Sequence, residues 1–182
     1  MPLLTLAEAK AQLDIESTAH DQELTAYIEA LTPMIERYVG PVENRTVTET
    51  VDSKGLALAV TQVPVVGLTS ITPILAGGLA LAVEDVRLDG AAGIIRRVDG
   101  SFFGGGPWDV VYVAGRGEIH PTINVAARIL LQHLWRTQYG AARGNSGSDD
   151  FDVNEPVVGW GYAIPNRVLQ MLEAFKVPPG VA

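Results

Sequence analysis

Apolar residues recur with helical spacing near the start of the chain. The stripe, with intervals of four, three, four and three residues, consists of Leu24, Ile28, Leu31, Ile35 and Tyr38. Such a stripe predicts an amphipathic helix with one buried face. We expect Asp21 to be its N-cap, Pro33 to kink it by removing one hydrogen bond, and Gly40-Pro41 to end it.

Three other segments also predict helices. Thr5-Leu-Ala-Glu8 has the Thr-x-x-Glu spacing of a capping box, so a short helix should begin there. A long helix is predicted after Pro121 and a short one after Pro165. The helix after Pro121 is apolar around most of its circumference, at Ile123, Val125, Ala126, Ala127, Ile129, Leu130, Leu131 and Leu134. So apolar a helix in so small a chain predicts contact with a neighbouring subunit.

Between these helices the sequence changes to strand character. Short apolar segments are separated by turn signals such as Ala76-Gly-Gly78 and Asp89-Gly90. The expected strands are Thr46–Val51, Leu56–Val60, Val65–Ile74, Leu79–Val83, Val86–Asp89, Gly93–Val98 and Trp108–Ala114. Because the turns are short, we expect antiparallel strands joined by hairpins.

The order of these elements predicts an α+β fold. N-terminal and C-terminal helices should form a small helical core, with a central antiparallel β meander inserted between them. The expected parts are an N-terminal helical part (1–44), a β-rich insert (45–115) and a C-terminal helical part (116–182), in one structural unit overall. The polar, glycine-rich segment 141–159 is expected to be a mobile loop.

Charge and composition narrow the possible functions. The net charge is −8, and the first forty residues carry two bases against seven acids. Tight DNA binding is therefore disfavoured, because it needs a basic surface, but an acidic surface that DNA passes without sticking is compatible with this balance. The absence of cysteine excludes a disulfide framework. No apolar run approaches the length of a membrane span, and the first residues do not resemble a signal peptide, so we expect synthesis in the cytosol and no membrane contact.

The stretch from Trp108 to Trp135 has the order of many enzyme sites: a strand, a glycine-bearing turn with a histidine, and a helix. Gly115-Arg-Gly117 lacks the third glycine of a dinucleotide loop, Glu118 would repel a phosphate, and Pro121 has no N–H to donate. We therefore interpret the stretch as a joint between sheet and helix. His120 is expected near the start of that helix.

Other candidate chemistry is weaker still. His133 lies among apolar residues, and His20-Asp21 lacks further ligands at metal-binding spacing. Glu84-Asp85 and Asp149-Asp150 are interpreted as solvated loop acids, and Ser101–Trp108 as either a binding loop or a hairpin tip. No Gly-x-Ser-x-Gly elbow is present. We therefore predict no catalytic residue, cofactor or metal site, and a structural or interaction protein rather than an enzyme.

Four segments, taken in order along the chain, form a pattern of short motifs. The first is Leu4-Thr-Leu-Ala-Glu-Ala-Lys-Ala-Gln-Leu-Asp14 with His20-Asp-Gln-Glu-Leu24 and Ile28-Glu-Ala30. The second is the Gly40 stop with Val63-Pro-Val-Val-Gly-Leu-Thr-Ser-Ile71. The third is Asp109-Val-Val-Tyr-Val-Ala-Gly115 with the helix from Pro121 through Ala126-Ala127. The fourth is Pro165-Asn-Arg-Val-Leu169 with Leu172 and Phe175-Lys176. In this order the four segments resemble the head–tail connector (adaptor) proteins of tailed double-stranded DNA phages. Segment 141–159 has no counterpart in the pattern of that family.

The resemblance implies a homo-oligomeric ring of twelve copies in the neck of the virion, assembled in the cytoplasm of a bacterial host. The ring would bind the portal protein and the next neck or tail protein, and genomic double-stranded DNA would pass through it without tight binding. The implied portal contacts are Pro165, Val168, Leu169, Leu172, Phe175, Lys176 and Val177. From the two apolar helices we predict subunit contacts at Leu24, Ile28, Leu31, Ile123, Leu130 and Leu134. No cofactor and no catalysis are implied.

Two alternatives stay open at this point. The chain could form another neck or tail ring, such as a stopper or a tail terminator, since residues alone do not separate ring positions. It could also be a small-molecule or nucleotide-binding enzyme. Saturable thermal stabilisation by a metal or a nucleotide would favour the enzyme.

Overall fold

The computed structural model describes residues 2–52, 55–104, 106–139 and 164–177, so the segment 141–159 lies outside the described residues. The chain divides into two compact units. A helical unit contains the described residues 3–34, 120–139 and 164–174, and a β unit contains those of 2, 35–119 and 175–177. The domain boundaries expected at residues 45 and 116 stay a prediction.

The helical unit begins with α1 (Leu6–Leu13), whose first turn is closed by the predicted capping box. Thr5 Oγ1 accepts a hydrogen bond from the Glu8 N–H at 3.2 Å, and the Glu8 carboxylate accepts one from the Thr5 N–H at 2.9 Å. Each residue thus satisfies a backbone donor that the first helical turn leaves free. The short helix ends at Asp14, whose φ of 57° is left-handed.

The next helix, α2 (Asp21–Val39), runs through Pro33 and crosses from the helical unit into the β unit at residue 35. Asp21 was expected as the N-cap but is the first helical residue, and the Leu24 N–H binds the His20 carbonyl at 2.9 Å. The expected stop is confirmed. Gly40 has a φ of +72° and its N–H returns to the Glu36 carbonyl, an arrangement that only glycine adopts without strain.

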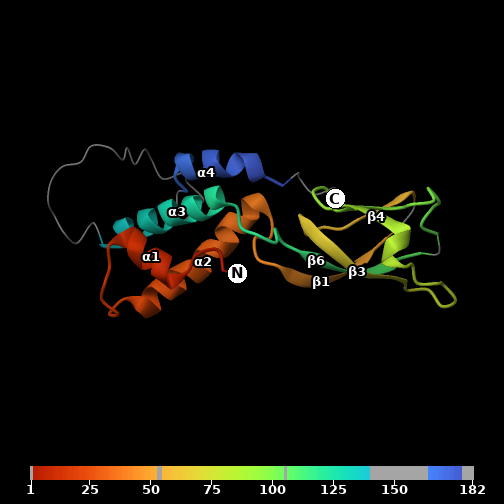
Figure 1. Ribbon diagram of the computed structural model, residues 1–182, viewed down its shortest axis with the longest axis horizontal. Helices are drawn as coiled ribbons and strands as arrows, with labels where there is room; N and C mark the ends of the chain where they lie inside the picture. The colour runs from red at the N-terminus through yellow and green to blue at the C-terminus, as the bar shows by residue number, and fades with distance from the viewer. Residues whose placement is uncertain (1, 53–54, 105, 140–163, 178–182) are drawn as a thin grey trace. The chain divides into compact units, whose positions relative to one another are not determined.

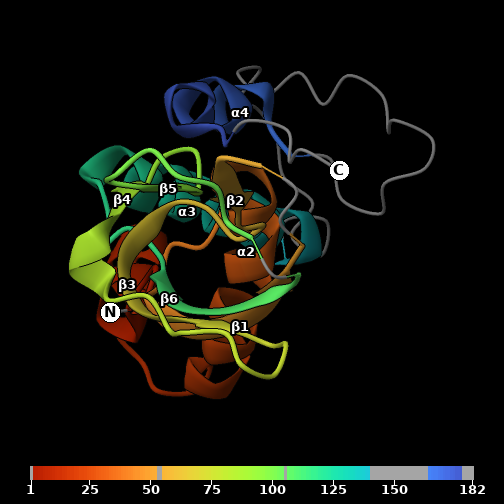
Figure 2. The same cartoon turned by 90° about the vertical axis from the view of Figure 1, so that its right-hand side faces the viewer.

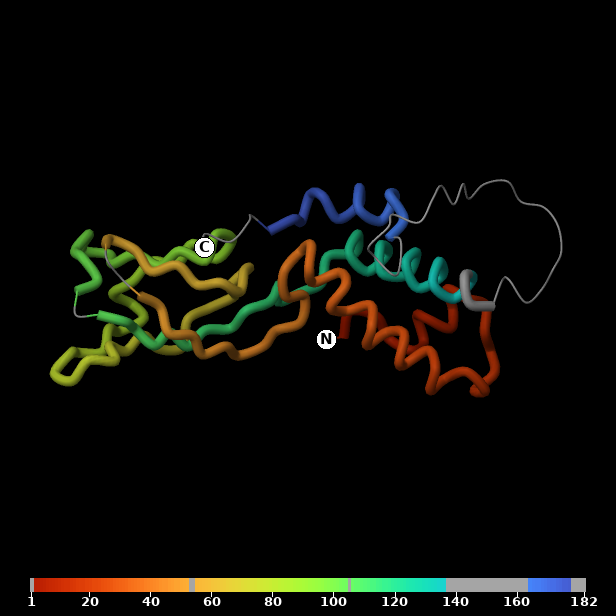
Figure 3. The backbone as a smooth tube through the Cα atoms, turned by 180° about the vertical axis from the view of Figure 1, so that it is seen from behind, coloured from red at the N-terminus to blue at the C-terminus, as the bar shows by residue number. Residues whose placement is uncertain are grey.

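The helix α3 (Pro121–Tyr139) packs against α1 and against α4 (Asn166–Leu172) of its own chain. Figures 1 and 3 show α3 running between these two helices. The buried side chains of α3 include Ile123, Ala126, Ala127, Leu130, Leu131 and Leu134. The wide apolar arc is therefore largely covered within the helical unit. Val125 is an exception, at 43% exposed.

The β unit consists of two three-stranded antiparallel sheets, which Figure 2 shows stacked. One sheet has the order β1 (Arg45–Val51), β6 (Trp108–Ala114), β3 (Val65–Pro73). The other has the order β2 (Ala57–Ala59), β5 (Ile94–Arg97), β4 (Val86–Asp89). The α+β class and the antiparallel pairing are confirmed.

The expected meander is wrong in its connections. Only β4 and β5 are neighbours both in sequence and in a sheet, because β6 enters the centre of its sheet and separates β1 from β3. The segment Leu79–Val83 is not a strand. Leu81 makes a single bridge to Ile71, and the chain then forms a 3-10 turn over Val83–Asp85.

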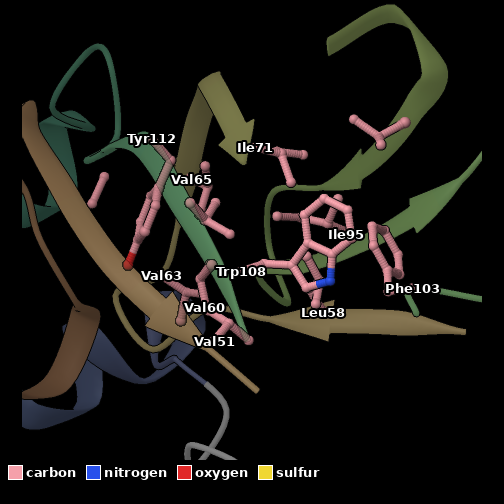
Figure 4. Close-up of a cluster of buried hydrophobic side chains, with 13 residues drawn as sticks. Val51, Leu58, Val60, Val63, Val65, Ile71, Ile95, Phe103, Trp108 and Tyr112 are labelled. Carbon is pink, nitrogen blue, oxygen red and sulfur yellow. The ribbon is translucent and has the colours of Figure 1, made fainter. Parts of the chain in front are cut away.

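The two sheets enclose one apolar core. Trp108, Val110, Tyr112 and Ala114 alternate along β6 and are all buried, which places them on the inner face of the sheet. From the second sheet, Leu58 and Ile95 are fully buried against them. Figure 4 shows Trp108 beside Ile95, Leu58 and Phe103, and the Phe103 and Trp108 rings meet edge to face at 5.8 Å. Backbone hydrogen bonds at one edge, such as that from the Val65 N–H to the Gly90 carbonyl, join the sheets.

Candidate functional site

The seven predicted portal contacts are divided between the two units. Four belong to the helical unit and three to the β unit: Pro165, Val168, Leu169 and Leu172, and Phe175, Lys176 and Val177, respectively. Val168 and Leu172 are buried against the helical core, whereas Leu169 is half-buried. In the β unit, Lys176 is exposed, and Phe175 and Val177 are half-buried. The portal-contact assignment stays a prediction, and the structure adds that two of the seven side chains already have an internal packing role.

The six predicted subunit contacts lie mostly inside the helical unit. The buried ones are Leu24, Leu31, Ile123, Leu130 and Leu134, and Ile28 is half-buried. These residues form the core of the unit itself, so little of their surface is available to another copy. Their assignment as subunit contacts stays a prediction, and any contact would involve mainly the residues around them.

The C-terminal segment Phe175–Val177 is fixed to the β unit by Arg116, in the turn after β6. Arg116 Nη2 donates hydrogen bonds to the Val39 carbonyl at 2.6 Å and to the Phe175 carbonyl at 2.8 Å. The guanidinium carbon also lies 5.6 Å from the centre of the Phe175 ring, within cation–π range. We call Arg116 and the residues Val39, Phe175 and Val177 the C-terminal clasp.

Val177 completes the C-terminal clasp through its backbone and its side chain. Its N–H donates to the Tyr38 carbonyl at 3.1 Å, and its side chain packs against the β core. A Cβ at Gly40 would lie 2.9 Å from Val177 Cγ1 and 1.9 Å from the Val63 carbonyl oxygen. The segment therefore fits closely against the end of α2, and Gly40 permits both the left-handed turn and this approach.

The electrostatics of the two carbonyl groups favour the positively charged side chain of Arg116. Val39 ends α2, and Phe175 ends the 3-10 turn Glu173–Phe175 that follows α4, so both carbonyls are at the negative ends of helices. Burial lowers the pKa of Arg116, and its Nε is buried without a hydrogen-bond partner among the described residues. The clasp thus holds a desolvated cation by carbonyl dipoles.

The sequence did not reveal this role of Arg116. Its two carbonyl partners lie 77 and 59 positions away along the chain, and backbone carbonyls leave no mark in a sequence. The available signal was an arginine between two glycines directly after a strand. That pattern suggested a phosphate-binding loop, which the missing third glycine excluded, and it gave no indication of a carbonyl-binding arginine.

The joint between β6 and α3 is confirmed as a structural element. Gly115 has a φ of 142° and lies so close to Asn44 that a Cβ would be 2.5 Å from Asn44 Oδ1, and the Gly117 N–H donates to the same oxygen at 2.9 Å. In the helical unit, His120 Nδ1 accepts a hydrogen bond from the Thr122 N–H at 3.2 Å. His120 therefore caps the start of α3, as expected.

The other residues that the sequence offered as catalytic or metal-binding candidates do not form a common site among the described residues. His20 lies near Glu23 and meets the Trp135 ring edge to face at 5.4 Å. Over residues 2–52, 55–104, 106–139 and 164–177, no group of three or more His, Asp or Glu could hold a metal ion. Glu84-Asp85 is an exposed part of a 3-10 turn, and Asp149-Asp150 lies outside the described residues. In the segment before β6, Phe102 is 68% exposed while Phe103 is buried in the core.

One polar network lies inside the β unit. The Tyr112 hydroxyl donates to Glu49 Oε2 at 2.7 Å and accepts from the Gln62 N–H at 3.2 Å. Burial, followed by the nearby Glu49 carboxylate, raises the pKa of Tyr112 to about 12. The phenol is therefore neutral at ordinary pH and acts as a fixed cross-link between β1 and the segment before β3.

Comparison with known proteins identifies the class. A family model described as "Head completion protein" matches residues 2–177 of this α+β chain. The chain belongs to the head completion protein family, which is a structural virion family and not an enzyme family. The predicted resemblance to head–tail connector proteins is thereby confirmed. No curated protein matches the chain significantly.

Solved structures share the fold along nearly the whole chain. A chain in the neck of an empty gene transfer agent particle, computed with C6 symmetry, has a TM-score of 0.65 and 18% identity, covering 98% of this chain and 92% of that one. A chain in the neck of the native particle, computed with C12 symmetry, has a TM-score of 0.61 and 18% identity, with coverages of 97% and 90%. A chain of the native virion of a gene transfer agent has a TM-score of 0.63, 18% identity and coverages of 98% and 92%. Among the described helices of our chain, none is long and apolar enough to span a bilayer.

Proposed function

We propose that the protein is the head–tail connector (adaptor) subunit of a phage-like particle, and that it forms a ring under the portal. The ring extends the DNA channel and offers the attachment surface for the tail. The observation that carries this proposal is the family match over residues 2–177. The similarity in fold to chains from particle necks, over 98% of this chain, supports it.

Twelve copies are proposed for the ring. The similar neck structures were computed with C6 and with C12 symmetry, and a twelve-membered ring is compatible with both. A closed ring needs a heterologous contact, in which two different surfaces of one subunit meet on its neighbours. Because the helical core is already filled by its own side chains, we place this contact on exposed residues rather than on the core positions.

The charge of the chain suits a conduit for DNA. With a net charge of −8 per copy, a ring of twelve would carry a strongly negative field. Such a surface does not neutralise phosphates, so DNA can pass without being retained. The proposal therefore requires that the ring bind duplex DNA only weakly even at low salt, where a basic surface would bind phosphates most strongly.

The portal contact is proposed at the C-terminal segment. Leu169 on α4 and Lys176 beyond it have surface available for a partner, whereas Val168 and Leu172 hold α4 on the helical unit. The C-terminal clasp keeps Phe175 and Val177 in place next to Lys176. Contacts that are ordered before docking cost less conformational entropy when the partner binds.

Mass photometry of the chain with and without the portal protein of the same particle tests the proposal. We expect single 19.4-kDa chains alone and a complex with twelve added copies, about 230 kDa of added mass, when portal rings are present. A chain that ignores the portal and instead binds an assembled tail end would move the protein to a stopper or tail-terminator position. Closed rings that form freely at low concentration would contradict templating by the portal.

A further inference from the structure

Two arginines stand directly opposite each other on the outer face of the β2-β5-β4 sheet. Arg87 on β4 is the cross-strand partner of Arg96 on β5, and both side chains are exposed. Directly opposed like charges destabilise an antiparallel pair. Both arginines line an open recess of about 360 Å³, together with Leu88, Asp89 and Gly90.

Neither arginine is neutralised within the described part of the chain. Arg45, Arg97 and Arg128 each form an ion pair with a carboxylate, and Arg116 binds two carbonyls. Arg87 and Arg96 have no such partner among residues 2–52, 55–104, 106–139 and 164–177. Asp89 also lines the recess, but its Oδ1 accepts the Ala92 N–H and forms no ion pair with them.

The helical unit carries the complementary charge. Its described residues, 3–34, 120–139 and 164–174, contain seven acids and four bases, which gives a net charge of −3. Glu16, before α2, and Glu29, on α2, are both exposed and form no ion pair in the described structure. Each copy therefore presents two unneutralised arginines on its β unit and unneutralised carboxylates on its helical unit.

We infer that the Arg87–Arg96 pair is the basic half of a subunit contact, and that it binds exposed carboxylates on the helical unit of a neighbouring copy, with Glu16 and Glu29 as the candidates. The inference rests on the proposed ring. Two different surfaces that fit each other head to tail are what a closed ring requires. A guanidinium pair can bind two carboxylates, which relieves the repulsion between the arginines only when the neighbour is present. DNA is a poorer fit, since two arginines beside Asp89 neutralise few phosphates.

The single variant Arg87→Glu separates this role from a structural one. It replaces a repulsive cross-strand pair with an attractive one, so the isolated chain should melt at the same or a higher temperature. Portal-templated ring formation, measured by mass photometry, should nevertheless fall at least tenfold. The double variant Arg87→Lys with Arg96→Lys keeps both charges and is the matched control, with ring formation close to that of the unchanged chain.

Charge exchange identifies the partner surface. The variant R87E/R96E and the variant E16K/E29K should each fail to form rings. Mixing them in equal amounts should restore rings, because alternating subunits then present opposite charges at every contact. The chain that combines all four substitutions should also assemble.

The outcomes are distinct. If the unchanged chain forms no ring on the portal, the proposed function fails and the inference fails with it. Normal ring formation by R87E/R96E would overturn the inference alone, and so would a mixture that is not restored. Normal rings with reduced binding of R87E/R96E to a short DNA duplex, measured by fluorescence anisotropy, would assign the arginines to DNA phosphates instead.

Discussion

Replacing Arg116 with alanine should release the C-terminal segment while leaving both units folded. The change removes the two hydrogen bonds from Nη2 to the carbonyls of Val39 and Phe175, and the contact with the Phe175 ring. The Val177 N–H bond to Tyr38 and the packing of the Val177 side chain against the β core do not involve Arg116 and remain in the variant. The β core itself does not depend on Arg116, because its buried side chains come from the strands and their loops.

The size of the effect follows from these contacts. Hydrogen bonds that involve a charged group contribute about 1.5–3 kcal/mol each, and a cation–π contact at a partly exposed site contributes about 0.5–1 kcal/mol. Against this stands the cost of keeping a buried cation whose Nε has no partner, and burial lowers the pKa of Arg116 for the same reason. We expect a net loss of about 2–3 kcal/mol in the local stability of the segment, which is roughly a 30- to 150-fold shift toward its released state.

Hydrogen exchange measured by mass spectrometry reads this equilibrium directly. The Val177 N–H should be protected in the unchanged chain and should exchange roughly 30- to 150-fold faster in Arg116→Ala, while strand β6 keeps its protection. Arg116→Lys retains the charge but not the guanidinium geometry and should give an intermediate rate. Unchanged exchange at Val177 in Arg116→Ala would refute the clasp, and loss of protection throughout β6 would show that Arg116 supports the whole unit instead.

Three further predictions concern stability. The pKa of Glu8 is lowered to about 2, first by the Thr5 N–H and hydroxyl and then by Arg128. The contribution of Glu8 to the stability of the fold is therefore full above pH 4.5 and is lost as the pH falls toward 2. Glu8→Gln should cost about 1 kcal/mol at neutral pH, and denaturant titrations should show that this difference vanishes in acid. Tyr112→Phe should lower stability by about 1–2 kcal/mol at any pH below about 10, and the difference should shrink as the pH rises from about 10 to about 12, in the same titrations. His120→Ala should cost about 1 kcal/mol in thermal melts by loss of the α3 cap and leave ring formation intact; abolished assembly would contradict a purely capping role.

The sequence predicted the elements that depend on local interactions. The Thr5–Glu8 capping box, the end of α2 at Gly40 and the start of α3 at Pro121 all involve partners within a few residues, so spacing alone reveals them. The alternation along β6 likewise predicted a strand with one buried face. Because these features are local, a single sequence is enough to predict the class of the fold.

The features that the sequence did not predict depend on contacts between residues that are far apart along the chain. Nothing local to Trp108–Ala114 says that it lies between β1 and β3, so the strands were wrongly expected to follow one another as hairpins. The apolar circumference of α3 predicted a subunit contact, which stays a prediction; that α1 and α4 of the same chain also pack against this helix was not predicted. Arg116 was missed for the same reason, since its partners are carbonyls 77 and 59 positions away. The family resemblance succeeded because it rests on the order of short motifs and not on their pairing.

A cryo-EM map of the particle neck, with this chain traced through its side chains, tests the central claim most directly. We predict twelve copies in one ring directly beneath the portal, with the segment around Leu169 and Lys176 against the portal and acidic side chains facing the DNA. A ring of this chain separated from the portal by another protein, or its absence from the neck, would contradict the account.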